Sequence, residues 1–282
     1  MPLPPNTTPI PPPIFLLGMS SAPAPTSTPL PGHAKEKKTN GLTTDQDQTG
    51  PSTNGVSSLA APAFAQPRLR LHLNDATDSG TGIFLSSIAP STLLPSAVSR
   101  VQKALYVQPA GDFHVPNTRS VTFIVRPMDG VAYTIGIDLD PEQHKEIHIS
   151  SRYVAGVAAD RRGPEIEGVI VHELVHCYQY NGLGYAPGGL IEGVADWVRL
   201  GAGLAPPHWK RGEEVNGKWD AGYQHTAFFL QYLEERFGDG TVRRLNEGLR
   251  GVKYEETSFW TGILGKTVDQ LWEDYKKLLT QG

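Results

Sequence analysis

The chain has 282 residues, a formal net charge of −4 at pH 7 and a sequence pI of about 6.1. Proteins that bind nucleic acid or anionic membrane surfaces usually carry an excess of basic residues, so this charge argues against both classes of partner. The single cysteine, Cys177, excludes an intrachain disulfide and fits a reducing compartment. No apolar run approaches the length of a membrane span.

The N-terminal region, residues 1–66, is rich in Pro, Ser, Thr and Gly. Such a composition cannot bury enough apolar surface to offset the entropy of ordering, so we predict a disordered tail over 1–66 and one folded domain over 67–282. The proline runs could bind a domain that reads polyproline segments, but an unstructured spacer is the simpler interpretation. The apolar stretch IFLLGM is short, is flanked by prolines and follows no Lys or Arg, unlike a secretory signal peptide.

The first part of the predicted domain contains strand-like segments. Arg68–Asp75 and Lys145–Val154 alternate apolar and polar residues, which is the pattern of half-buried strands. Between them, the segments RSVTFIVRP and VAYTIGIDL flank Asp129-Gly130, a dipeptide typical of hairpin turns, so we predict that these two segments pair directly. One helix is predicted in this half, over Ser91–Tyr106.

From Pro164 onward the pattern is helical. A first helix begins at Pro164 or Glu165, and a glycine-rich loop over Asn181–Gly189 follows it. Later helices are predicted over Gly189–Gly203, Ala221–Phe237, Thr241–Leu249 and Val268–Leu279. Strands followed by helices indicate an α+β fold, with the sheet in the N-terminal half and a mainly helical C-terminal half.

The helix that begins near Pro164 carries the segment VIVHELVHCYQ. His172 and His176 lie four residues apart on one helix face, where they can bind one ion, and Glu173 can reach a water on that ion. Apolar residues form a stripe on another side, so most of the helix is expected to be buried: Ile166, Ile170, Leu174 and Cys177. We expect Cys177 to be a packed thiol rather than a ligand.

Buried ionisable side chains need partners. Zinc (Zn2+) binds neutral imidazoles and lowers the pKa of a bound water to about 7, so the HExxH segment predicts a zinc site with Glu173 as general base. Two buried histidines held by ordinary hydrogen bonds are the alternative interpretation.

The next predicted helix supplies two candidates for a third ligand. Glu192 and Asp196, in GGLIEGVADWVRLGAG, are four residues apart and share a helix face. One carboxylate can bind the metal while the other orients a ligand histidine. The longer reach of Glu192 favours it as the ligand and Asp196 as the outer partner, with the reverse assignment left open. The apolar residues around the pair argue against an ordinary solvated helix face.

These motifs resemble those of a known family. The run HExxHxxQ, NGxG, APGGLIEGxADxVRL and PxHW, up to Trp209, is similar to the hallmark of plant and fungal basic secretory proteins, also called peptidases of plants and bacteria. The resemblance continues through Trp219–Glu235. It implies a zincin-like fold of the gluzincin kind, with a mixed sheet packed on the HExxH helix. It also implies a zinc-dependent peptidase in which Glu192, in the E-G-x-A motif, joins His172 and His176 as a metal ligand.

The resemblance also suggests how a substrate is handled. Zincins often use a Tyr or His to polarise the substrate carbonyl, and Tyr223 is the first candidate, ahead of His225. They bind the substrate as an added strand at a sheet edge, for which Lys145–Tyr153 is the natural candidate because it leads into the metal helix. The expected partner is a peptide or protein; the oligomeric state stays open.

The chain departs from the family pattern by being acidic and by its long proline-rich extension. The lack of a recognisable signal peptide predicts a cytoplasmic location, whereas the resemblance suggests secretion. Two other functions are kept as alternatives: a catalytically weak or inactive zinc-site domain that acts as a binding or defence module, and a metal-free interaction protein that uses the tail. The acidic charge, the extension and the lack of a recognisable signal peptide do not affect the candidate site residues.

Overall fold

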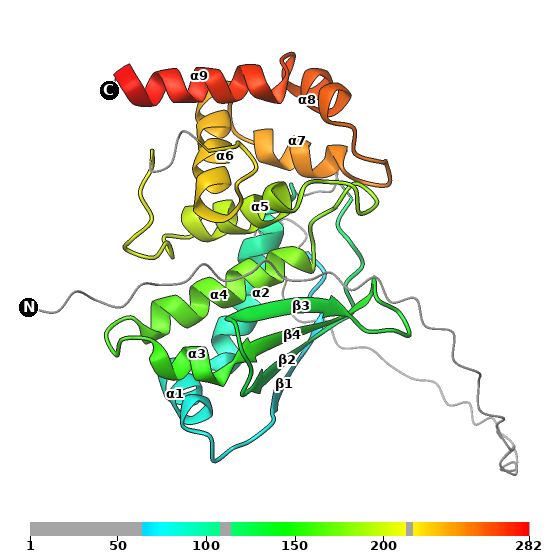
Figure 1. The fold of residues 1–282 in the computed structure, drawn as a ribbon. Helices are drawn as coiled ribbons and strands as arrows, with labels where there is room; N and C mark the ends of the chain where they lie inside the picture. The colour runs from blue at the N-terminus through cyan, green and yellow to red at the C-terminus, as the bar shows by residue number, and fades with distance from the viewer. Residues whose placement is uncertain (1–63, 108–113, 213–216, 282) are drawn as a thin grey trace, which may run out of the picture. The chain divides into compact units, whose positions relative to one another are not determined.

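The structure is a computed structural model, and it describes residues 64–107, 114–212 and 217–281 (Figure 1). Most of the predicted tail lies outside these residues, so its disorder stays a prediction. Its last residues already contact the domain, because the Ala65 carbonyl accepts a hydrogen bond of 2.9 Å from Gln102 Nε2.

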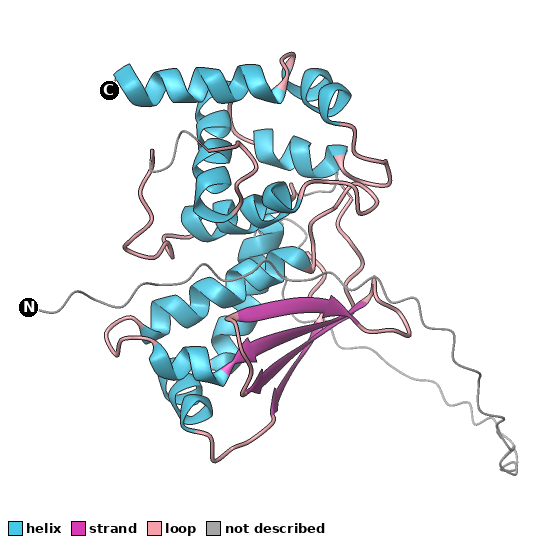
Figure 2. Ribbon diagram, in the orientation of Figure 1, coloured by secondary structure: helices cyan, strands magenta, loops and turns pink. Residues whose placement is uncertain are grey.

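A four-stranded mixed sheet forms in the N-terminal half, and helices make up the C-terminal half (Figure 2). The α+β prediction is therefore confirmed. In chain order the elements are β1 (Arg68–Leu73), α1 (Ser79–Ser87), α2 (Pro90–Leu105), β2 (Ser120–Arg126), β3 (Ala132–Gly136), β4 (His144–Ser150), α3 (Ser151–Gly156), α4 (Arg162–His176), α5 (Gly188–Gly201), α6 (Tyr223–Phe237), α7 (Thr241–Gly248), α8 (Glu256–Leu264) and α9 (Val268–Gln281).

Most predicted elements match the observed ones within a few residues, but the end of the predicted strand Lys145–Val154 is wrong. Strand β4 stops at Ser150, and α3 follows directly. The Ser150 hydroxyl accepts a hydrogen bond from Tyr153 N, which caps the new helix. A capping serine within an alternating segment is a helix start that the period-two pattern conceals. Helices α1 and α8 were also not predicted.

The strand order is β1-β2-β4-β3. Strand β4 lies between β2 and β3, parallel to the first and antiparallel to the second. The predicted hairpin between the segments around Asp129-Gly130 is therefore wrong. Gly130, with φ at +80°, still helps to reverse the chain, but residues 127–131 carry it past the position that β4 occupies. A turn dipeptide specifies a local reversal and does not determine which strand becomes the neighbour.

The sheet edges also differ from the expectation. Among the described residues, β3 and β1 are the edge strands and β4 is interior, so Lys145–Tyr153 cannot accept an added strand. Strand β3 is the edge that packs near α4 (Figure 1). Any strand addition close to the HExxH helix must therefore use β3.

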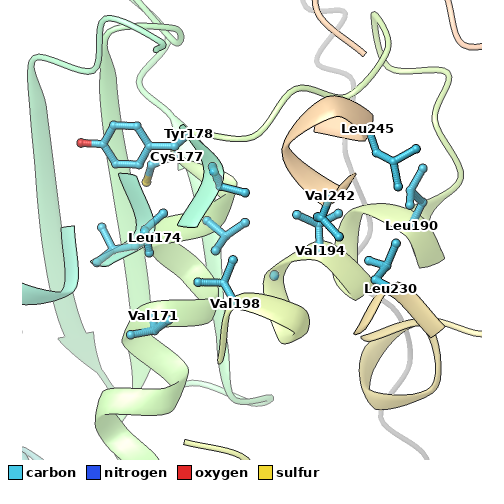
Figure 3. Packing of buried hydrophobic residues seen from close by; sticks show 14 of the residues in the cluster. Val171, Leu174, Cys177, Tyr178, Leu190, Val194, Val198, Leu230, Val242 and Leu245 are labelled. Atoms are coloured by element: carbon cyan, nitrogen blue, oxygen red, sulfur yellow. The ribbon is translucent and has the colours of Figure 1, made fainter. Parts of the chain in front are cut away.

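The core joins the inner face of the sheet to the helices. Sheet residues with at most 2% of their surface exposed pack in one cluster with residues of α2 and α4: Val121, Phe123, Val125, Ile147 and Ile149. The next layer is α5, whose Val198 lies near Val171 of α4 while its Val194 lies toward α6 and α7 (Figure 3). Helix α5 thus contributes to the packing on both of its sides.

Within the described residues, no single helix has the length and apolar composition needed to cross a bilayer. Helices α1 and α2 meet those criteria only when taken as a pair, and the pair is bent by 71°.

Candidate metal centre

The candidate site lies where the last turns of α4 meet α5. His172 Nε2 is 3.0 Å from Glu192 Oε2 and 3.2 Å from His176 Nε2. His176 Nε2 is 3.8 Å from the same Glu192 oxygen. The structure therefore brings together the three side chains that the sequence predicted as metal ligands.

This donor set fits zinc. Zinc bonds to nitrogen and oxygen of about 2.0–2.2 Å place neighbouring tetrahedral ligand atoms about 3.3 Å apart, and the observed separations lie on both sides of this value. The three side chains are 11–16% exposed, so an ion there would be largely shielded from solvent. No second cluster of three or more such side chains occurs in the part of the chain that the structure describes. Two imidazoles and one carboxylate leave a fourth zinc position open.

Asp196 lies behind the first histidine rather than beside the other donors. Its Oδ1 is 2.6 Å from His172 Nδ1, which is the ring nitrogen that faces away from Glu192. Asp196 is only 1% exposed, and its Oδ2 has no hydrogen-bond partner among the described residues. This geometry suits an outer partner that fixes the tautomer and orientation of His172.

The carboxylates make the centre favourable for a cation. Burial lowers the pKa of His172, but the charge and hydrogen bond of Asp196, together with Glu192, outweigh it and raise this pKa to about 10. Burial and the neighbouring His172 lower the pKa of His176 to about 4. Burial raises the pKa of Glu173 to about 7, against the opposing effects of His172 and a hydrogen bond from Thr134. Positive charge is therefore favoured at His172, whereas His176 keeps a neutral ring.

Glu173 is held by the edge strand. Thr134 Oγ1 on β3 lies 2.6 Å from Glu173 Oε2 and 3.0 Å from the Glu173 carbonyl oxygen. Thr134 was not predicted, and no local pattern could have identified it, because 39 residues separate it from Glu173. The contact fixes the predicted general base against β3.

Gln179 is the second contact that the sequence interpretation missed. Its side-chain nitrogen lies 2.8 Å from His176 Nδ1. The spacing of three residues in HExxHxxQ places both side chains on one side of the helix end, so this contact had a sequence signal.

Glycines on α5 bring the start of α6 to the site. A side chain at Gly189 would place its Cβ 1.8 Å from the Asp220 carbonyl oxygen, and one at Gly193 would lie 2.3 Å from Thr226 Cγ2. The two glycines are one helical turn apart, so α6 lies directly on this face of α5. This close approach positions Tyr223, the first residue of α6.

Tyr223 lies next to the candidate metal ligands. Its ring lies parallel to that of His172, with the centroids 6.4 Å apart. The residue is 44% exposed, and its φ of 47° is unusual for a non-glycine residue. Partial burial and the nearby carboxylates raise its pKa to about 12, so the phenol keeps its proton at neutral pH. Of the two residues suggested for carbonyl polarisation, Tyr223 has a ring contact with His172, a candidate ligand; His225 lies two positions further along α6.

Two other polar residues have structural surroundings. Arg199 on α5 pairs with Glu165 on α4 at 2.8 Å. Its guanidinium packs against Gly168, where an added Cβ would lie only 2.6 Å from Arg199 Nε. Cys177 is 2% exposed, and burial raises the pKa of its thiol. Arg199 therefore links α5 to α4, and Cys177 is a packed, uncharged thiol.

A family model described as peptidase of plants and bacteria matches residues 66–275. The chain belongs to this family. The match confirms the resemblance inferred from the HExxHxxQ and IEGVAD motifs, and it covers the sheet, α4 and α5. Searches of curated proteins and of solved structures gave no significant match. The family is described as one of peptidases, and membership assigns this protein a peptidase role at that level. The corresponding substrates are peptides or proteins.

For this family member, we predict that Gly193→Ala reduces the free energy of unfolding by about 1–3 kcal/mol, because the added methyl group overlaps Thr226. Gly201→Ala, in the same helix, is the matched control: nothing lies within 4 Å of its added Cβ, so a change of at most about 1 kcal/mol, towards greater stability, is expected. Urea denaturation of both variants measures the difference. Equal effects would contradict the close packing of α5 on α6.

Proposed function

We propose that this protein is a zinc-dependent peptidase that hydrolyses peptide bonds with Glu173 as general base. The observation that carries this proposal is the set of three donor atoms, on His172, His176 and Glu192, that lie within 4.8 Å of one another next to Glu173. A zinc ion, when bound, supplies a Lewis acid that acidifies water and polarises a carbonyl group.

The chain's own groups have separate tasks in this reaction. The Glu173 carboxylate accepts a proton from the attacking water and delivers it to the nitrogen of the leaving amine. The Thr134 hydroxyl holds one oxygen of that carboxylate at 2.6 Å, which orients the base without replacing it. The Tyr223 hydroxyl, protonated at neutral pH, donates a hydrogen bond to the carbonyl oxygen of the substrate.

Strand β3 is the proposed site where the substrate adds to the sheet as an extra strand. It is an edge of the described sheet, and it carries Thr134, which touches the general base. A peptide that pairs with the free side of β3 would pass close to Glu173, with backbone hydrogen bonds providing affinity that is independent of sequence. This replaces the earlier expectation for β4, whose two sides are both paired.

A site that only binds metal does not require a general base with its own support. The contact between Thr134 and Glu173 therefore favours a catalytic centre over an inactive binding module. A structural zinc site also usually has four protein ligands, whereas three cluster here.

We expect Glu173→Gln to retain zinc and lose turnover. The amide has nearly the same shape as the carboxylate but cannot take a proton from water, and loss of a general base costs about 10²–10⁴-fold in rate. Chelator-sensitive hydrolysis of a peptide library, with zinc content measured in parallel, tests this expectation.

Glu167→Gln is the control for that substitution. It is the same chemical change on the same helix, at a carboxylate that pairs with Arg100 at 3.3 Å. Activity of the Glu167 variant should stay near that of the wild type. Near-normal activity of the Glu173 variant would overturn the assignment of the base.

The two α5 carboxylates should respond differently. Glu192→Ala removes a donor oxygen that lies 3.0 Å from His172 Nε2, and most zinc binding should be lost. Asp196→Asn leaves the three donors in place and weakens only the support of His172, which costs about 10–100-fold in affinity. Zinc titration of both variants decides between them. If Asp196→Asn empties the site while Glu192→Ala retains the metal, the two roles are reversed.

A further inference from the structure

The two ligand histidines are supported from behind by different groups. His172 Nδ1 faces the Asp196 carboxylate at 2.6 Å, while His176 Nδ1 faces the Gln179 amide at 2.8 Å. Gln179 comes just after α4, where its backbone N–H donates to the Val175 carbonyl at 2.8 Å. The backbone that carries the amide is therefore fixed relative to the helix.

The direction of this second hydrogen bond decides what His176 can do. A neutral imidazole has one N–H and one nitrogen with a free lone pair. If the Gln179 nitrogen donates to His176 Nδ1, the ring proton sits on Nε2, which is the atom 3.2 Å from His172 Nε2. A protonated Nε2 has no lone pair for a metal. Binding through Nε2 requires an N–H on Nδ1 and an acceptor opposite it.

Gln179 can supply that acceptor after a rotation of its amide by 180°. The two ends of an amide have nearly the same shape, so packing is unchanged by the rotation. Gln179 Oε1 is buried and has no hydrogen-bond partner among the described residues. The rotation gives Oε1 the partner that it lacks, and it moves the side-chain nitrogen from Nδ1 to the place that Oε1 now holds.

We infer that Gln179 is a positioning residue for His176. Its amide oxygen accepts a hydrogen bond from Nδ1–H, keeps the ring proton away from Nε2 and so prepares Nε2 to bind a cation. This inference rests on the proposed function, because it assumes that His176 binds zinc through Nε2.

The chemistry of an amide suits this position. With zinc bound, Glu192 and Asp196 would already balance the charge of the ion, and Glu173 lies beside them. A neutral acceptor behind His176 orients the ring without adding charge to this buried group, whereas an apolar side chain would leave Nδ1–H unpaired. A carboxylate at residue 179 would also accept the hydrogen bond. The acceptor, rather than the exact side chain, is therefore the feature that zinc binding requires.

Zinc affinity, measured by competition with a chelator on the full chain, tests the inference. Gln179→Leu keeps similar volume but removes the acceptor, and the dissociation constant for zinc should rise about 10–100-fold. Gln179→Glu restores an acceptor, and its dissociation constant should stay within about threefold of the wild-type value or fall below it. A residue that only packs would not be rescued by a buried charge.

Gln102→Leu is the matched control. Gln102 is 1% exposed and its Nε2 donates to the Ala65 carbonyl at 2.9 Å, so this variant also loses a buried glutamine hydrogen bond, on a different helix. Thermal unfolding should show a loss of stability, whereas zinc affinity should not change.

Two results would overturn the inference alone while the wild type binds zinc: unchanged affinity in Gln179→Leu, or equal weakening in Gln179→Glu and Gln179→Leu. A wild-type protein that binds no zinc would overturn both this inference and the proposed function. Weak binding in Gln179→Leu with rescue in Gln179→Glu supports both.

Discussion

The packing of α4 against α5 is the constraint on which the rest of the site depends. Helix α4 carries His172 and His176, and helix α5 carries Glu192 and Asp196. These side chains therefore meet only at one relative position of the two helices. Apolar side chains such as Val198 and Val171, which lie near each other, line the interface (Figure 3). The buried ion pair between Arg199 and Glu165 fixes it further, and the absence of a side chain at Gly168 makes room for the guanidinium.

The same interface concentrates ionisable groups in a poorly solvated place. Glu173, Glu192 and Asp196 are all buried. Buried negative charge is costly unless a cation compensates it. Against the effect of burial, Asp196 and Glu192 raise the pKa of His172, whereas burial and His172 lower the pKa of His176. A divalent cation between the donors would relieve the repulsion of all three carboxylates.

The sequence predicted which candidate side chains lie together better than it predicted the pairing of the strands. The i, i+4 spacing of His172 and His176 is a local consequence of helix geometry, so one sequence was enough to place them together. The pairing of β4 between β2 and β3 depends on contacts that are remote in sequence, and the Asp129-Gly130 signal said nothing about them. Thr134 escaped prediction for the same reason, whereas Gln179 lay within reach of a helical-spacing argument.

The central claim is that one zinc ion is held by His172, His176 and Glu192. A crystal structure of the zinc-loaded protein, with anomalous diffraction recorded at the zinc absorption edge, tests it most directly. The account predicts one peak about 2.0–2.2 Å from the Nε2 atoms of both histidines and from a Glu192 oxygen, with Asp196 outside bonding distance. A zinc-loaded crystal with no peak between α4 and α5, or with Asp196 in place of Glu192, would contradict it.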